Sequence, residues 1–93
     1  MDSIMQNEKE CYVCGACRNI HEHHIYFGAN RKVSEQNGFK CCLCGRHHNQ
    51  SNEGVHGKNG HALDQHLKQE CQRVYERNHT REEFIGLIGR SFL

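Results

Sequence analysis

The chain has 93 residues, 35% of them hydrophobic, and its 12 Lys and Arg against 11 Asp and Glu give a formal net charge of +1. A chain this short buries only about 60–65% of its unfolded surface, so we expect one domain whose hydrophobic core alone gives marginal stability. No stretch reaches the roughly 18 apolar residues of a transmembrane helix. The small net charge excludes a bulk polycation, so any nucleic-acid binding must come from a local patch.

Seven Cys and nine His indicate that something other than the core stabilises the fold. An odd number of Cys argues against a closed disulfide framework, and the opening residues MDSIMQNEKE lack the apolar run of a signal peptide. We therefore expect a cytoplasmic, reducing environment, in which clustered Cys and His are typically metal ligands. In a domain of this size a bound metal would supplement the thin core.

The first half of the chain is expected to alternate knuckles, strands and loops. Residues 1–10 are polar and are expected to be flexible. A Cys-rich knuckle at 11–17 precedes a strand or short hairpin at 18–27, where β-branched and aromatic residues concentrate. Residues 28–38 are expected to form a polar loop with a single helical turn at 34–36.

A second strand is expected within 39–48, where it runs into a second knuckle, and Asn, Ser and Gly mark 49–60 as a loop. Beyond it the apolar positions recur at the spacing of one helix face: Leu63, Leu67, Cys71, Val74 and Tyr75. Thr80 with Glu83 forms a capping box, which predicts a second helix ending at Gly89. That helix presents four apolar residues: Phe84, Ile85, Leu87 and Ile88. It is expected to fold back over the first helix, whose Leu63, Leu67 and Val74 should face inward. The domain is thus divided into a core at 11–60 and a helical part at 61–93.

Two ligand pairs, Cys11-x2-Cys14 and Cys44-x2-His47, predict a structural Zn²⁺ site. They are separated by 29 residues, and two such pairs held apart by a folded segment are typical of closed tetrahedral zinc sites. The other thiols leave alternatives open. Cys17 or Cys41 could replace one of the four ligands, while Cys42 and Cys71 are expected to be small buried apolar side chains.

A second group of potential ligands is the histidine cluster around HEHH at residues 21–24. An isolated His is ordinarily a surface or hydrogen-bonded residue. Several imidazoles close together would repel one another when protonated, and each would need a partner if buried. A second metal or a phosphate would resolve both difficulties.

The segments CYVC, HEHHI, CLCGRHHN and GVH together resemble the HNH endonucleases that have a ββα-metal core and zinc knuckles. The closer resemblance is to small phage-encoded HNH proteins related in motif to recombination-enhancement nucleases, and it spans residues 11–93. It implies an α+β fold, a small zinc-stabilised, treble-clef-like core followed by C-terminal helices. It also implies a metal-dependent DNA endonuclease in a bacterial host cell, encoded by a phage or prophage and acting in recombination. A recombinase or other DNA-processing partner and a dimeric state stay open.

The resemblance also assigns roles to individual histidines. His23 matches the metal ligand and His24 the catalytic base that follows it, and neighbours on a strand point to opposite faces. His48 matches the remaining ligand of a catalytic divalent ion by its position, and His56 is the competing or additional ligand; the ion would be Mg²⁺, Mn²⁺, Ni²⁺ or Zn²⁺. His21 and Glu22 receive no role. The middle Asn of the family has no counterpart at the matching place, and three residues could stand in for it: Asn30, Asn37 or Asn49.

Basic residues near these motifs are candidate phosphate contacts, namely Arg31, Lys32 and Arg46, although a solvated loop would also explain them. Two other classes of protein compete with the nuclease. A non-catalytic zinc-binding DNA-binding module would need a stronger basic stripe than this chain has. A zinc-stabilised protein-interaction module is consistent with the nearly neutral charge.

Overall fold

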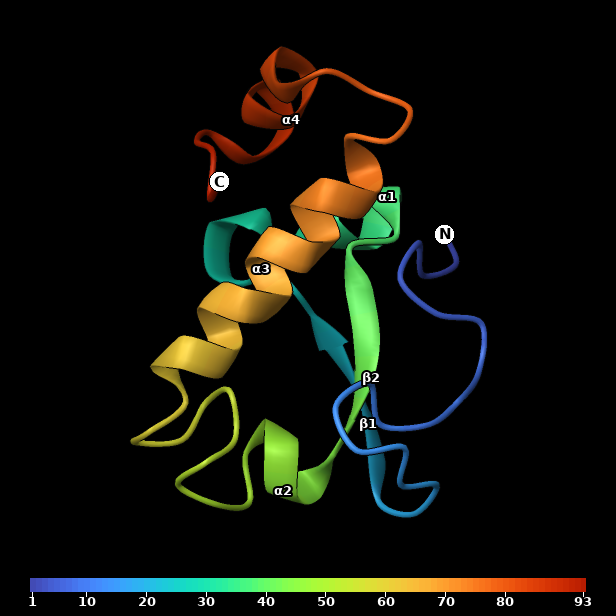
Figure 1. The fold of residues 1–93 in the computed structure, drawn as a ribbon, viewed down its shortest axis with the longest axis vertical. Helices are drawn as coiled ribbons and strands as arrows, with labels where there is room; N and C mark the ends of the chain where they lie inside the picture. Colours follow the sequence, from blue (N-terminus) through green and yellow to red (C-terminus); the bar gives the residue numbers. More distant parts are fainter.

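A computed structural model describes all 93 residues of the chain and shows a small α+β fold built on one antiparallel hairpin. In chain order the elements are β1 (Ile20–His24), the 3-10 turn η1 (Gly28–Asn30), α1 (Arg31–Asn37), β2 (Lys40–Cys44), α2 (Gly45–His48), α3 (His61–Tyr75) and α4 (Arg81–Ile88). The hairpin and α3 occupy the middle of the molecule, with α4 at one end and α2 at the other (Figure 1). None of the helices combines the length and the apolar character needed to cross a bilayer.

The register of the hairpin decides which histidines share a face. Ile20 pairs with Cys44, and His23 pairs with Cys41. Because side chains alternate along a strand, His21 and His23 lie on one face of β1 while Glu22 and His24 lie on the other. The hairpin therefore divides HEHH into two pairs.

The segment between the strands differs from the expected loop with one turn. It forms η1 and the two-turn helix α1, which covers residues 31–37. The helix is fixed by a buried polar contact rather than by an apolar stripe, since the Ser34 hydroxyl donates to the Tyr26 carbonyl at 2.6 Å and accepts from the Tyr26 amide at 3.2 Å. Gly38 ends α1 in the left-handed conformation at φ +71°, which glycine adopts without steric cost.

The N-terminal residues 1–10 contain no helix or strand, yet they contact this part of the fold. The Ile4 amide donates to the Gly38 carbonyl at 3.0 Å. The Ser3 hydroxyl donates to the Lys40 carbonyl, and the Gln6 side chain accepts from the Cys42 amide. A side chain at Gly38 would meet the Asp2 carbonyl, so this glycine also permits the close approach of the N-terminal segment.

The core lies between the hairpin and the two C-terminal helices. Its aromatic centre consists of Tyr26, Phe39 and Phe84, with ring centroids 5.4 to 6.1 Å apart. Edge-to-face and tilted packing at this spacing is favourable for aromatic rings. Leu67 and Cys71 of α3 are buried in the same cluster, and Leu63 and Tyr75 are half-buried against it, as the helical periodicity predicts. Val74, the remaining position of the predicted face, is half-buried and lies outside this cluster.

The capping box of α4 is present, with Thr80 and Glu83 bonded reciprocally. Phe84 and Ile88 point into the core and Leu87 is half-buried, whereas Ile85 is 39% exposed. Phe84 and Ile88, four residues apart, share the buried face of α4, while Ile85 follows Phe84 directly, lies about 100° farther around the helix and stays exposed.

Candidate metal centres and active site

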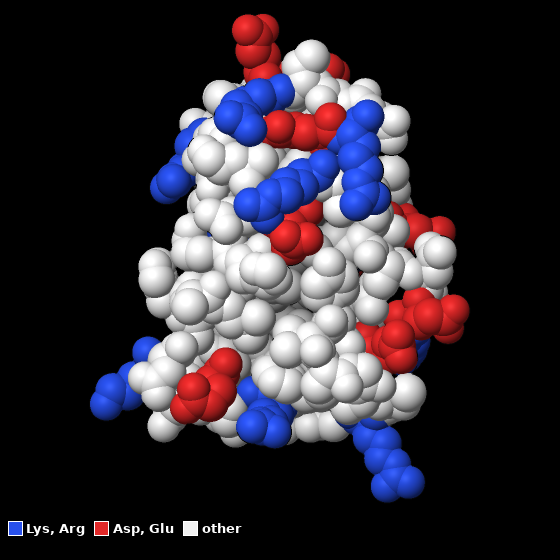
Figure 2. Space-filling model, in the orientation of Figure 1, with Lys and Arg blue, Asp and Glu red and all other residues white.

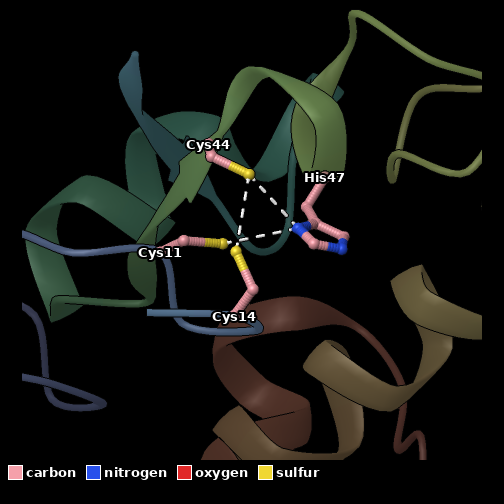
Figure 3. Close-up of side chains that lie close together, drawn as sticks. All are labelled: Cys11, Cys14, Cys44 and His47. Carbon is pink, nitrogen blue, oxygen red and sulfur yellow. Dashed lines mark hydrogen bonds between the residues drawn. The ribbon is translucent and has the colours of Figure 1, made fainter. Parts of the chain in front are cut away.

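Four side chains from two segments far apart in the sequence converge at the α2 end of the hairpin (Figure 3). Cys11 and Cys14 come from a tight turn in which the Gly15 amide donates to the Cys11 carbonyl at 2.8 Å, with Gly15 at φ +77°. Cys44 ends β2, and α2 begins directly after it and turns His47 back toward the same point. The ligand atoms of the four residues all lie within 4.8 Å of one another.

The distances within this cluster match those of a tetrahedral zinc site. Zn–S bonds of about 2.3 Å and Zn–N bonds of about 2.0–2.1 Å place two sulfurs roughly 3.8 Å apart and a sulfur and a nitrogen roughly 3.6 Å apart. The Cys14 and Cys44 sulfurs are 3.8 Å apart. The His47 Nδ1 lies 3.6 Å from the Cys11 sulfur and 3.2 Å from the Cys44 sulfur. The Cys₃His cluster could therefore hold a structural Zn²⁺ through His47 Nδ1.

The electrostatics at Cys11 favour the thiolate that zinc requires. Burial raises the pKa of Cys11, but the backbone amides of Cys44, Cys14 and Val13 outweigh burial and bring the pKa down to about 6. A thiol with such a pKa is largely ionised at neutral pH. The preformed amide donors thus prepare one ligand of the cluster before any ion binds.

The other four thiols of the chain lie outside the cluster. Cys17 is exposed and donates to the Gly15 carbonyl at 3.6 Å. Cys41 is buried in the core, where burial strongly raises its pKa. Neither replaces a ligand. Cys71 is buried as expected, and burial raises its pKa to about 12, whereas Cys42 is only half-buried, because it lies on the opposite face of β2 from Cys41.

A second cluster joins His23 of β1, His48 of α2 and His56 of the loop that follows α2. Their ligand atoms also lie within 4.8 Å of one another, and the ring centroids are 4.9 to 5.3 Å apart. The His56 amide donates to the His48 carbonyl at 3.0 Å, which holds the loop against α2. The three histidines expected to share an ion are thus brought together.

His23 is the most constrained member of this cluster. It is 2% exposed, and its Nε2 has no hydrogen-bond partner. Burial, and then the neighbouring His48 and His56, lower the pKa of His23 to about 3. A neutral buried imidazole with an orphaned nitrogen fits a metal ligand, since ligation would satisfy an atom that is otherwise costly to bury.

A chain of hydrogen bonds leads from the surface into the cluster. The Asn19 amide nitrogen lies 2.6 Å from Gln50 Oε1, Asn19 Oδ1 lies 3.1 Å from His21 Nε2, and His21 Nδ1 lies 2.9 Å from His48 Nδ1. Because the Asn19 carbonyl oxygen can only accept, His21 Nε2 donates to it and neutral His21 Nδ1 accepts. His48 then donates from Nδ1, which leaves the lone pair of His48 Nε2 free.

His24 belongs to a different set of contacts on the other face of β1. Its Nε2 lies 3.1 Å from Glu35 Oε1, and Lys40 Nζ lies 2.7 Å from Glu35 Oε2. Lys40, and then His24, lower the pKa of Glu35 to about 2. Glu22 is more distant, 3.7 Å from Lys40 Nζ. The ligand atoms of Glu22, His24 and Glu35 also lie within 4.8 Å of one another. Both carboxylates already pair with the Lys40 ammonium, so the set forms an ion-pair network.

The two histidine sets meet at one pocket of about 220 Å³. Seven residues line it: Glu22, His23, His24, Phe27, Arg31, His48 and His56. Of the three basic residues expected to contact phosphate, Arg31 therefore reaches the pocket, while the exposed Lys32 and Arg46 do not line it.

None of the three candidates for the middle Asn has a side-chain hydrogen bond to the histidines. The Asn30 and Asn37 side chains donate to the carbonyls of Ile88 and Val33, at 3.1 and 2.9 Å. Asn49 is exposed beyond the end of α2. The Asn that is linked to the cluster is Asn19, which bonds to His21, and His21 in turn bonds to His48. The sequence offers a signal for His21, because side chains two apart on a strand share a face and His21 therefore lies beside His23.

Comparison with known proteins gives no relative, since no family model, no curated protein and no solved structure matches the chain.

Proposed function

We propose that the chain is a metal-dependent DNA endonuclease of the HNH type, with a ββα-metal core that hydrolyses phosphodiester bonds. One observation carries the proposal. Three imidazoles within ligand distance of one another, a histidine hydrogen-bonded to a carboxylate, and an arginine all line one pocket. Converging ligands, a base and a cation are the groups that phosphodiester hydrolysis uses.

His23, His48 and His56 would hold a divalent ion, and a three-His set leaves positions open for substrate. When bound, the ion would neutralise the charge of the scissile phosphate and stabilise the leaving 3′ oxygen. The products would then carry 5′-phosphate and 3′-hydroxyl ends. The buried, unpartnered Nε2 of His23 supports this assignment.

His24 is suited to act as the general base. Its Nε2 donates to the ionised Glu35 carboxylate across 3.1 Å, so the lone pair of neutral His24 is at Nδ1. That nitrogen can accept a proton from the attacking water, as histidine does near neutral pH. Glu35 fixes the tautomer and the orientation of the ring, a role comparable to that of the carboxylate in other His–carboxylate pairs.

The structural zinc site supports the same pocket mechanically. His47 and His48 are adjacent on α2, so an ion held by Cys11, Cys14, Cys44 and His47 would fix the helix that carries a ligand of the second ion. Arg31 would contact the phosphate in the pocket, and Lys32 and Arg46 would contact phosphates farther along the strand. The proposed phage origin and recombinase partner are supported by the motif resemblance alone.

The distribution of charge favours an enzyme over a DNA-binding module without catalysis. On the face drawn in Figure 2, acidic and basic side chains are interspersed and form no continuous basic stripe. Binding through phosphate contacts alone relies on such a stripe. A compact pocket with a few cations suffices for an enzyme that binds one phosphate at its reacting centre.

Nicking of supercoiled plasmid with Mg²⁺, Mn²⁺, Ni²⁺ or Zn²⁺, with EDTA as the blank, tests the proposal. His24→Ala should keep its metal content and lower the rate by about 10²–10⁴-fold. His23→Ala should weaken metal binding, so that activity partly returns at high metal concentration. His66→Ala, on the exposed side of α3, is the matched control and should cut like the parent.

Three outcomes would contradict the assignments. Full activity of His24→Ala would mean that another group is the base. Equal activity of His23→Ala, His24→Ala and the control would show that the cluster is not catalytic. Tight DNA binding without metal-dependent nicking by the parent would identify a non-catalytic DNA-binding module.

A further inference from the structure

A second pocket lies directly beside the histidine pocket. It measures about 170 Å³ and is lined by Tyr26, Phe27, Asn30, Lys68, Ile88, Arg90 and Phe92. Phe27 lines both pockets, so a chain-like ligand seated in the first pocket would enter the second with its next unit.

Two cations face this pocket and no carboxylate lines it. Arg90 is exposed, and its Cζ lies 4.3 Å from the centroid of the Phe92 ring. Its Nε donates to the Ser91 carbonyl at 3.2 Å, and its guanidinium pairs with no carboxylate. Its remaining N–H groups are therefore available to an anion.

Lys68, the second cation of this pocket, lies near two aromatic rings and is paired with a carboxylate. Its ammonium lies 4.4 Å from the Phe27 ring centroid and 5.6 Å from that of Phe92. It also pairs with Asp64 at 2.8 Å, which balances much of its charge. The unbalanced positive charge at the pocket is thus that of Arg90, while Lys68 supplies directed N–H donors between the two rings.

The aromatic side chain shared by the two pockets is unusually exposed. Phe27 is 41% exposed, although burying it would be favourable. Exposed aromatic rings beside cations are the combination with which proteins bind single-stranded nucleic acid, because bases stack on the rings while cations contact the backbone. In a duplex the bases remain stacked on one another and are not presented to such a ring.

We propose that this second pocket is a subsite for the nucleotide next to the scissile phosphodiester, which it binds unpaired. The phosphate of that nucleotide contacts Arg90 and Lys68, and its base packs against Phe27. The inference deepens the proposed endonuclease function and rests on it. It assigns a substrate class to the enzyme: DNA with at least one unpaired nucleotide beside the cleavage point.

Binding measured by fluorescence anisotropy separates this subsite from the nuclease function. The full-length His24→Ala protein would be titrated with one labelled oligonucleotide, single-stranded or annealed to its complement, over a salt series. Arg90→Gln in this background should weaken single-strand binding about three- to tenfold and lower the salt slope by about 0.7, as expected for one lost phosphate contact. Arg77→Gln makes the same charge change at an exposed residue outside the pocket and should have little effect.

Phe27→Leu tests the base contact. It should weaken single-strand binding about five- to tenfold and leave duplex binding unchanged, and the metal content of the variant checks the neighbouring histidines. Equal effects of Arg90→Gln and Arg77→Gln would overturn the phosphate contact, and equal losses for single strand and duplex would overturn the unpaired base. If the His24→Ala protein itself bound neither oligonucleotide, both the phosphate contact and the base contact would be overturned.

The two proposals can fail separately. Selective loss of binding in Arg90→Gln and Phe27→Leu, without any metal-dependent cleavage by the parent, would keep the subsite and reject the nuclease. Cleavage by the parent, with unchanged binding in both variants, would keep the nuclease and reject the subsite.

Discussion

His21 Nδ1 lies 2.9 Å from His48 Nδ1, across 27 residues of sequence. Only one of two neutral imidazole nitrogens in such a contact can donate. His21 already donates from Nε2 to the side-chain oxygen Oδ1 of Asn19, so its Nδ1 is the acceptor. His48 donates, and its Nε2 remains available to an ion. His21 is therefore a positioning residue for a proposed metal ligand.

Replacement of His21 by Phe should weaken the second metal site by about 10- to 100-fold, the usual effect of removing the hydrogen-bond partner of a metal-bound histidine. The ring volume is roughly retained, so the fold should keep its thermal stability. Cobalt titration followed by its visible absorption gives the affinity without any activity assay. His66→Phe is the control, and an unchanged cobalt affinity in His21→Phe would remove His21 from the site.

Replacement of Cys14 by Ser should abolish stoichiometric zinc and destabilise the domain. Structural zinc contributes on the order of 10 kcal/mol in small modules, and a loss of even about 3 kcal/mol lowers the melting temperature of a domain of this size by more than roughly 10 °C. Zinc content and thermal unfolding check this expectation. The exposed Cys17, which lies outside the cluster, gives the matched variant Cys17→Ser, which should keep both zinc and stability.

Replacement of Leu67 by Ala should lower the free energy of unfolding by about 2–4 kcal/mol, because the side chain is 1% exposed and its removal leaves a cavity in the core. Urea denaturation gives the value. Ile85→Ala removes a similar volume from a side chain that is 39% exposed, so its cost should be well under half as large. Equal costs would mean that α3 does not face the core.

The features that the sequence predicts well are those set by neighbours along the chain. The two knuckles have ligand spacings that only a tight turn or a first helical turn can satisfy, and the capping box of α4 lies within four residues. The periodicity of α3 places Leu67 and Cys71 in the core for the same reason. Such patterns need no knowledge of the rest of the fold.

The features that the sequence misses depend on contacts across the fold. The sequence does not predict the full length of α1, because the helix has no apolar stripe and is attached to Tyr26 by the buried Ser34 hydroxyl. The role of Asn19 requires knowing that α2 returns beside the start of β1, where the Gly45 amide donates to the Asn19 carbonyl at 3.0 Å. The second pocket forms because the C-terminal Phe92 packs against Tyr26, and no local sequence pattern predicts that contact.

The buried state of His23 predicts how stability depends on pH. Burial lowers its pKa in the folded protein to about 3, while the unfolded chain has the ordinary value near 6.5. Between these two values the unfolded state binds more protons than the folded state. The contribution of His23 to stability is therefore complete above about pH 6.5 and is lost progressively as the pH falls toward 3.

Urea denaturation at a series of pH values from 7 to about 5 measures this loss, with one equivalent of zinc to fill the Cys₃His cluster and no excess metal that could bind His23. In that range each unit of pH below 6 should cost the parent up to about 1.4 kcal/mol from His23 alone. His23→Phe lacks the titrating group, so its stability should fall less steeply, and the difference between the two slopes removes the contribution of the zinc ligands that both proteins share. Parallel slopes would show that His23 takes up a proton in the folded protein as readily as in the unfolded chain, which its lack of a hydrogen-bond partner at Nε2 argues against.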